Sequence, residues 1–97
     1  MRIDGFDWDG GNWPKCARHG LSKVQIESIF DGELGIFDDP FDAADEHRFR
    51  AIGRDGQGRH IFIVFCIRDL RGLKLLRPIS ARYMHAREIR HYEQQKA

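Results

Sequence analysis

The feature that most constrains this chain is the almost unbroken apolar run at residues 60–67, His-Ile-Phe-Ile-Val-Phe-Cys-Ile. A run of this kind is typical of a strand that is covered on both faces, so it predicts the central strand of a sheet. Residues 47–54 alternate and predict a neighbouring strand with two unlike faces. One face would hold Phe49, Ala51 and Gly53, and the other Arg48, Arg50, Ile52 and Arg54. Between the two strands, Asp-Gly-Gln-Gly at residues 55–58 predicts a hairpin connection.

Residues 68–72 predict a turn, and residues 74–81 a further strand that returns from it. Alternation along this strand would place Lys74, Leu76, Ser80 and Arg82 on one side. Pro78 has no N–H to donate to a sheet ladder, so we expect either a free edge or a local bulge at this position.

Helices are predicted at both ends of the chain. Pro14 suits the first turn of a short helix, and Gly20 is a suitable stop after it. Ser22 and Gln25 have the spacing of a capping box, so a second helix should begin at Ser22. Its buried stripe would hold Ile26, Ile29 and Phe30, with Val24 outside. A closing helix over residues 84–94 would align His85, Glu88, Ile89 and Tyr92 on one stripe.

Two shorter strand candidates, at residues 2–8 and 34–37, complete the pattern. The whole order predicts a single α+β domain over residues 1–97, with an antiparallel β-sheet of about four strands, two N-terminal helices and a C-terminal helix. A chain of 97 residues can bury one core, but it is too small for two domains or for a large enclosed substrate pocket. The working surface should therefore be open.

The net charge of +1 hides a strong division along the chain. Residues 1–46 carry 4 Lys and Arg against 11 Asp and Glu, whereas residues 47–97 carry 12 against 4, so the halves have net charges of −7 and +8. A basic half of this size suits a polyanion such as RNA. The alternative is a solvated surface on which the two halves neutralise each other.

No window approaches the length of a membrane span and no secretory leader is apparent, so we expect no membrane partner. Cys16 and Cys66 lack the paired spacing of a zinc site or a redox motif, which favours a reduced, cytoplasmic protein over a disulfide-bridged one. The acidic segment at residues 38–46 could bind a hard cation, but it lacks the order of a calcium loop and is expected to be a solvated loop. We therefore expect no metal and no cofactor.

Residues along nearly the full length resemble the BrnT-type toxins of bacterial toxin–antitoxin operons. Each match is weak alone, and their order and spacing together are specific. The matching positions are Trp8-Asp9, Lys15, Arg18-His19-Gly20-Leu21-Ser22, Phe30, Asp39-Pro40, Glu46, Arg48, Ile52-Gly53-Arg54, Arg59, Ile79-Ser80-Ala81-Arg82, Glu88 and Tyr92-Glu93.

The resemblance implies a ribonuclease with a RelE-like fold. It also implies a BrnA-like ribbon-helix-helix antitoxin that holds the enzyme off, in a heterotetramer with two toxins, and that represses the shared operon, so that operator DNA is contacted only through the antitoxin. The sequence departs from the family in two places. Met84-His85 stands where the family usually has Ala-Thr, and Lys23-Val24-Gln25 stands where it often has Phe-Glu-Glu after Ser22.

RNA can be cut without a metal when its own 2′-hydroxyl attacks the neighbouring phosphorus, provided that the protein holds the phosphate and offsets the growing negative charge. Guanidinium suits this task because its planar donors match phosphate oxygens in pairs. The candidates are Arg82 first, then Arg54, with Lys15 as a point charge. A surface ion pair remains the alternative for Arg82, and simple solvation for Arg54.

Proton transfer would fall to His19 or His85, because imidazole titrates nearest neutral pH. The alternatives are a helix-capping role for His19 and a helix-surface pair between His85 and Glu88, while Glu88 could instead pair with Arg82. The RNA-binding candidates are Arg48, Arg50, Arg59 and Tyr83, and Trp8, Trp13 and Tyr83 could stack on bases. The competing functional class is a non-catalytic module that binds nucleic acid or protein through the basic half.

Overall fold

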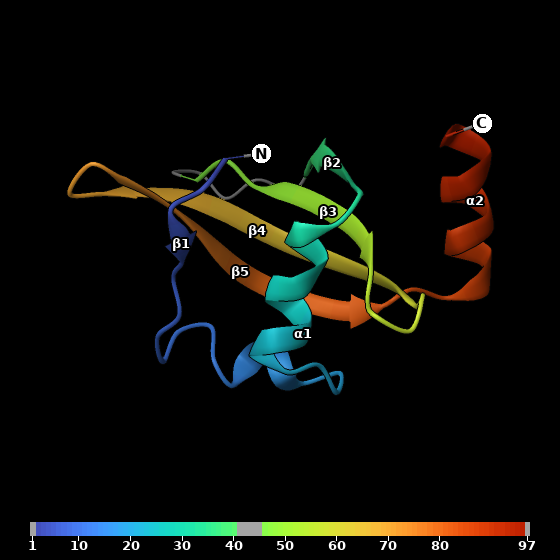
Figure 1. The fold of residues 1–97 in the computed structure, drawn as a ribbon, viewed down its shortest axis with the longest axis horizontal. Helices are drawn as coiled ribbons and strands as arrows, with labels where there is room; N and C mark the ends of the chain where they lie inside the picture. Colours follow the sequence, from blue (N-terminus) through green and yellow to red (C-terminus); the bar gives the residue numbers. More distant parts are fainter. Residues whose placement is uncertain (1, 41–45, 97) are drawn as a thin grey trace.

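A computed structural model describes residues 2–40 and 46–96 of the chain. Its centre is a five-stranded sheet in the order β1-β5-β4-β3-β2, with α1 against one face and α2 standing at one end (Figure 1). All strand pairs are antiparallel except β1 with β5. The elements are β1 (Gly5–Phe6), η1 (Lys15–Ala17), α1 (Lys23–Ser28), η2 (Ile29–Asp31), β2 (Leu34–Asp38), β3 (Phe49–Arg54), β4 (His60–Leu70), β5 (Leu73–Tyr83) and α2 (Ala86–Lys96).

This arrangement confirms the predicted α+β class and is consistent with a RelE-like fold. The sheet has five strands where about four were expected, and its edge strand β1 lies within the strand candidate at residues 2–8. The first of the two predicted N-terminal helices is a 3-10 turn, η1, whose middle residue Cys16 is buried. The helix after it forms as predicted, because the Ser22 side chain accepts the Gln25 N–H while the Gln25 side chain accepts the Ser22 N–H.

The core lies between α1 and the sheet face that we call the core face. Ile61, Ile63 and Phe65 point into it from β4 and are fully buried. Ile26 of α1 and Ile29 of η2 cover them from the other side. Val24, on the outer side of α1, is 75% exposed, so the predicted stripe of this helix is confirmed.

The partnering of β5 shifts at Pro78, as its missing N–H led us to expect. Ser80 pairs with Val64, but the next β4 residue, Phe65, pairs with Pro78, so Ile79 is an extra residue in the strand. The bulge reverses the alternation on its two sides. Leu76 therefore faces the core and is fully buried. Lys74, two residues before Leu76, has the same facing. The prediction that Lys74 and Leu76 share a side with Ser80 and Arg82 is wrong for this reason.

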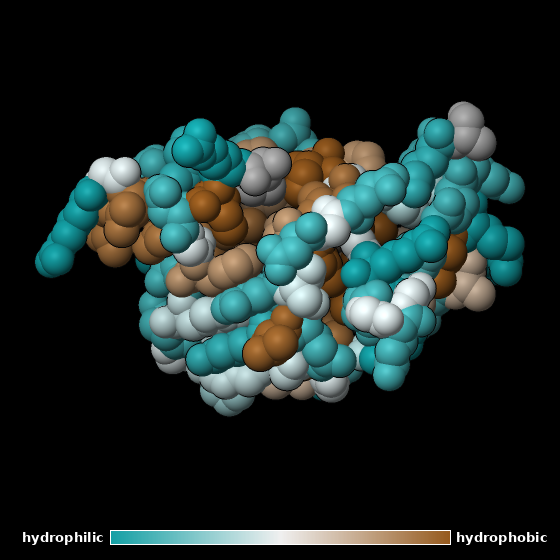
Figure 2. Space-filling model, in the orientation of Figure 1, coloured by the Kyte–Doolittle hydropathy of each residue, from teal (hydrophilic) through white to brown (hydrophobic). Residues whose placement is uncertain are grey.

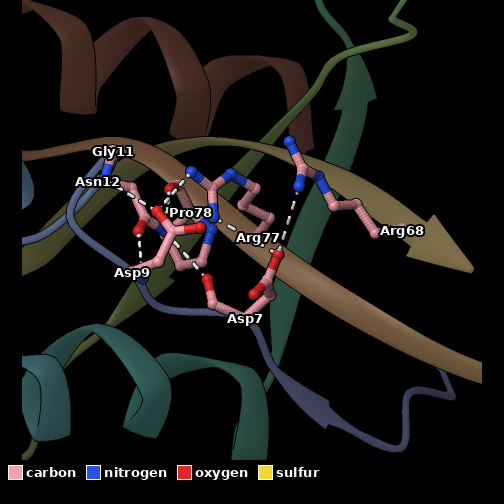
Figure 3. A network of polar contacts seen from close by, with 7 residues as sticks. All are labelled: Asp7, Asp9, Gly11, Asn12, Arg68, Arg77 and Pro78. Atoms are coloured by element: carbon pink, nitrogen blue, oxygen red, sulfur yellow. Dashed lines mark hydrogen bonds and ion pairs between the residues drawn. The ribbon is translucent and has the colours of Figure 1, made fainter. Parts of the chain in front are cut away.

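A polar network fastens the segment before η1 to the bulge (Figure 3). The Asn12 side-chain amide, almost fully buried, donates to the carbonyl oxygens of Asp7 and Pro78, both at 2.9 Å. The Arg77 guanidinium lies 3.3 Å from Asp7 and 2.9 Å from Asp9, and its hydrogen bond lowers the pKa of Asp9. These contacts hold the segment before η1 against β5, and they thereby fix the position of Lys15.

The hairpin of β4 and β5 extends further than the sequence indicated. Both strands run past the expected turn, and only Arg71 and Gly72, both with positive φ, separate Leu70 from Leu73. The hairpin projects from the rest of the sheet at the end away from α2 (Figure 1). Its tip carries Leu70 and Leu73 with about half of each side chain exposed.

Cys16 and Cys66 are free and buried, and burial is the largest cause that raises the pKa of each thiol. Cys66, within the apolar run of β4, is 1% exposed. In the part of the chain that the structure describes, no helix has the length and apolar character to cross a membrane.

Candidate active site

The sheet face opposite α1 carries most of the predicted site residues, and we call it the open face. Gly53 of β3 points toward the core face, since a Cβ there would lie 3.1 Å from the Ile29 side chain. Because side chains alternate along a strand, Ile52 and Arg54, on either side of Gly53, point to the open face. The residues of β4 and β5 that pair with them point to the same face. The open face thus holds Arg48, Arg50, Ile52, Arg54, His60, Phe62, Val64, Ser80 and Arg82.

Helix α2 meets the open face through one buried residue, Tyr92, which is 9% exposed. The Tyr92 ring packs edge-on against Phe37 of β2 at 6.2 Å and against His60 at 6.3 Å, measured between ring centroids. The close approach requires Gly35, because a Cβ there would lie 2.9 Å from the Tyr92 hydroxyl. The rest of α2 is largely hydrophilic (Figure 2). Apolar burial alone therefore holds this helix weakly.

Charge pairs supply the remaining attachment, and the first joins Arg82 to Glu88. Both guanidinium nitrogens of Arg82 donate to the two Glu88 oxygens at 2.8 Å. Glu88 also accepts the backbone N–H of His85 at 2.9 Å, so it caps the start of α2. The hydrogen bonds from Arg82 and from His85 lower the pKa of Glu88 to about 2. The same pair raises the pKa of Arg82.

Two guanidinium groups share one aromatic ring beside this pair. Arg82 lies over Phe62 at 4.7 Å and Arg50 lies over it at 5.7 Å, from each guanidinium carbon to the ring centroid. Arg50 is also bonded to the buried Asp39, at 3.2 Å. Arg50, Phe62 and Glu88 line a cavity of about 380 Å³, which we call the α2 cleft, together with residues that include Phe37, His91 and Tyr92. Arg50 of β3 thus lines the α2 cleft, and Arg82 of β5 lies beside it, over the same Phe62 ring.

A second charge cluster lies on the other side of Tyr92. Glu93 of α2 is 3.3 Å from Arg54 and 3.1 Å from the Nε2 atom of His60. The hydrogen bond to His60 is the main cause that lowers the pKa of Glu93, and Arg54 adds to it. Arg54 and Arg82 therefore lie on the same face of the sheet, and each is held by a carboxylate of α2.

Lys15 reaches the site from η1. It lines a small polar cavity of about 160 Å³ with Arg48, Arg77 and Glu46. Arg48 is 3.1 Å from Glu46. This cavity continues the cationic surface of the open face toward the bulge in β5, so Lys15 and Arg48 lie at one end of the face and Arg54 at the other.

The other predicted residues lie elsewhere. Tyr83 is on the core face, where its hydroxyl accepts from the Gln25 side chain at 3.5 Å. Arg59 lies 4.5 Å over the Tyr83 ring and 2.9 Å from Asp55. His19 is exposed in the turn after η1, and His85 is exposed just before α2. Neither histidine lines the α2 cleft.

Several residues of the site were not among the sequence candidates, namely Phe37, Phe62 and His91 of the α2 cleft, and the neighbouring pair of His60 and Glu93. Phe62 could have been found, because alternation through residues 60–67 puts it on the same face as Arg50. His91 and Glu93 could not, since their role depends on how α2 docks.

Trp8 and Trp13, the other stacking candidates, pack edge-on against each other at 5.4 Å beside the core. Most of the acidic segment expected at residues 38–46 lies outside the described residues. Within the described residues, Asp38 pairs with His47 at 2.9 Å, and no three His, Cys, Asp or Glu side chains gather as a metal would require.

Comparison with known families gives a match over most of the chain. Residues 8–88 match the family model of BrnT, the ribonuclease toxin of type II toxin–antitoxin systems. A search of curated proteins finds no match. The matched residues include η1, the whole sheet from β2 to β5, and both Arg82 and Glu88. The chain therefore belongs to the BrnT family of ribonuclease toxins.

Proposed function

We propose that this protein is a metal-independent endoribonuclease whose RNA substrate lies on the open face, with the scissile phosphate between Arg82 and Arg50 beside the α2 cleft. The observation that carries the proposal is the convergence of Arg82 and Arg50 on the Phe62 ring. Glu88 and the Tyr83 carbonyl take three of the five N–H donors of Arg82, so donors remain for phosphate oxygens, which accept guanidinium donors in pairs. The open shape of the face suits an extended polymer.

Cleavage proceeds by attack of the RNA's own 2′-oxygen on the neighbouring phosphorus. A bond forms between the 2′-oxygen and phosphorus, and the bond from phosphorus to the 5′-oxygen breaks. The products are a 2′,3′-cyclic phosphate and a 5′-hydroxyl. Arg82 and Arg50 offset the charge that builds on the non-bridging oxygens in the transition state. Glu88 fixes the direction of the Arg82 guanidinium, so it is a positioning residue.

Two protons must move in this reaction. One leaves the 2′-hydroxyl as it attacks, and one is added to the departing 5′-oxygen. His91 lines the α2 cleft and is the first choice for one of these steps. His60 lies on the next row of the open face and is oriented by Glu93. His19 and His85 remain the further candidates. Replacing each of the four histidines by Ala in turn tests which of them transfers a proton.

Other cations bind the RNA on either side of the cleft. Arg54 lies opposite His60 at one end of the open face, and Arg48 and Lys15 lie toward the other end. Arg59 and Tyr83 would contact RNA only if the strand passes around the end of β5 onto the core face. Binding through phosphates should weaken as salt concentration rises, because counterions are released on binding.

The family places this toxin beside an antitoxin. We infer that the antitoxin is a BrnA-like ribbon-helix-helix protein, that two toxins and two antitoxins form the complex, and that operator DNA is bound through the antitoxin alone. Both proteins are cytoplasmic in this proposal, where the RNA substrate of the free toxin is found.

The test is an incubation of purified, antitoxin-free protein with RNA in the presence of EDTA. The wild type should cut, and Arg82→Ala should lower the cleavage rate by about 100-fold to 1,000-fold, the usual cost of losing one preorganised charge donor. Arg90→Ala is the matched control, since this exposed arginine of α2 lies outside the site. Thermal unfolding of each variant checks that the domain remains folded.

Two outcomes would overturn the proposal. Intact RNA at high protein concentration would favour the non-catalytic module, above all if RNA is bound in a salt-sensitive manner. Cutting that stops with EDTA and returns with magnesium or manganese would contradict metal independence.

A further inference from the structure

A second cavity adjoins the α2 cleft, between the β2–β3 edge of the sheet and the C-terminal half of α2. Its volume is about 510 Å³, enough for a planar nucleobase. Ile52 and Tyr92 form part of an apolar floor, and the rim is charged. The charged or polar residues of the lining are Glu33, Arg54, His60 and Lys96.

Phe37 separates this cavity from the α2 cleft and lines both. Phe37 is 43% exposed, and no other Phe, Tyr or Trp in the part of the chain that the structure describes is as open to solvent. Only its edge-on contact with Tyr92, at 6.2 Å, is a ring contact. An exposed ring at the mouth of a cavity offers a stacking surface, and unpaired bases of RNA use such surfaces.

The cavity lies one row along the sheet from the phosphate site. Arg82, Phe62 and Ile52 form one row of cross-strand neighbours, and His60 with Arg54 forms the next. Successive residues on one strand face are about 7 Å apart, since each residue advances the strand by about 3.3 Å. A nucleotide whose phosphate contacts Arg82 can therefore place its base, or that of its neighbour, in the cavity.

The rim displays both a carboxylate and guanidinium or ammonium donors. Guanine is the base that presents two adjacent N–H donors, N1–H and N2–H, on one edge and two acceptors, O6 and N7, on another. Glu33 can accept from the donor edge, and Arg54 or Lys96 can donate to the acceptor edge. Glu33 is exposed and has no hydrogen bond or ion pair among the described residues.

We propose that this cavity is a nucleobase subsite that receives a guanine next to the cleaved phosphate, with Phe37 as the stacking ring and Glu33 as the group that reads the base. The inference rests on the proposed ribonuclease activity. It adds a substrate preference to that activity and names the residues that set it.

The experiment compares RNA oligonucleotides that contain one guanosine, adenosine or inosine at a fixed position in a uridine background. Inosine lacks only the N2 amino group of guanosine. The wild type should cut beside guanosine roughly tenfold faster than beside adenosine, the scale of one bidentate base contact. Inosine should fall between them.

Glu33→Gln should remove the difference between guanosine and inosine and should lower cutting beside guanosine toward the rate beside adenosine. Phe37→Leu should slow cutting of all three substrates. Asp31→Asn is the matched control, because Asp31 is a nearby exposed carboxylate that does not line this cavity. Binding of uncleavable oligonucleotides with a 2′-deoxy residue at the cleaved position, followed by fluorescence anisotropy, gives a second readout that needs no catalysis.

The outcomes separate the two proposals. RNA that is cut with no preference for guanosine, or with a preference that survives Glu33→Gln, overturns the subsite and leaves the nuclease intact. The same loss of preference in Asp31→Asn also overturns it, because the effect would then come from net charge. No cutting of any oligonucleotide overturns the nuclease itself.

Discussion

The two faces of the sheet are built from the same three strands and differ in almost every physical property. On the core face, Ile61, Ile63 and Phe65 are fully buried under α1 and η2. On the open face, their immediate neighbours are His60, Phe62 and Val64, which lie among the arginines of β3 and β5. In β4, therefore, every second side chain packs into the core, and the side chains between them face the proposed site. Substitutions on opposite faces of β4, only a few residues apart, should therefore separate stability from activity.

The comparison of Phe65 with Phe62 should give the largest effect. Phe65→Ala removes a fully buried ring that contacts Phe30 and Phe49, so the free energy of unfolding should fall by about 3–5 kcal/mol. Phe62→Ala removes a half-buried ring, so the loss should be about 1–2 kcal/mol. Cleavage should respond in the opposite order, because Phe62 supports both guanidinium groups. Urea denaturation and RNA cleavage by each variant measure the two quantities.

Val64→Ala, on the open face between them, provides the control for loss of apolar volume away from the aromatic ring. Equal destabilisation by Phe65→Ala and Phe62→Ala would contradict the contrast between the faces. So would full activity of a folded Phe62→Ala protein.

The boundary between the faces depends on the bulge in β5, and Asn12 tests it. Asn12→Ala removes the amide that donates to Asp7 and Pro78 and leaves both carbonyls without that partner. Loss of buried hydrogen bonds of this kind costs about 1–3 kcal/mol. We expect that range in denaturation, together with weaker RNA binding, because the segment that carries Lys15 loses its anchor.

Ser28→Ala is a suitable control, since its hydroxyl makes an exposed hydrogen bond within α1. A stable Asn12→Ala protein that retains wild-type RNA binding would mean that the network of Figure 3 does not position Lys15.

Local sequence patterns were sufficient to predict the strands and one helix boundary. Alternation at residues 47–54 placed Arg48, Arg50 and Arg54 on one face and Gly53 on the other, and the structure has the same division. The Ser22 capping box fixed the start of α1. Such patterns predict well because they depend on neighbours within four residues along the chain.

The position of side chains beyond the bulge could not be obtained in this way. Pro78 indicated that the ladder would be disturbed, but a free edge and a bulge were both open, and only a bulge reverses the facing of Leu76 relative to Arg82. The position of α2 on the sheet could not be predicted from local patterns either. It depends on the contacts of Glu93 with His60 and Arg54, which precede it in the chain by 33 and 39 positions.

The smallest effect should be the response of α2 to acid, because Arg82 and Glu88 are both about one-third exposed and α2 is peripheral. The pKa of Glu88 is about 2 in the folded protein and 4.5 in an unperturbed glutamate. A lowered folded-state pKa stabilises the folded form above the unfolded value, and this contribution is lost as the pH falls toward the folded value. Docking of α2 should therefore weaken between pH 4.5 and about 2.

Amide hydrogen exchange in α2 across this pH range measures the effect, with the amides of β4 as an internal reference for the core face. Glu88→Gln should weaken protection of α2 at neutral pH, and it should reduce the change toward acid to the part that Glu93 contributes, since a glutamine has no charge to lose. Glu93→Gln is the control that keeps the Arg82 pair. If wild type and Glu88→Gln lose protection of α2 in parallel as the pH falls, the ion pair with Arg82 does not hold α2 on the open face, and the helix is retained by Tyr92 and Glu93 instead.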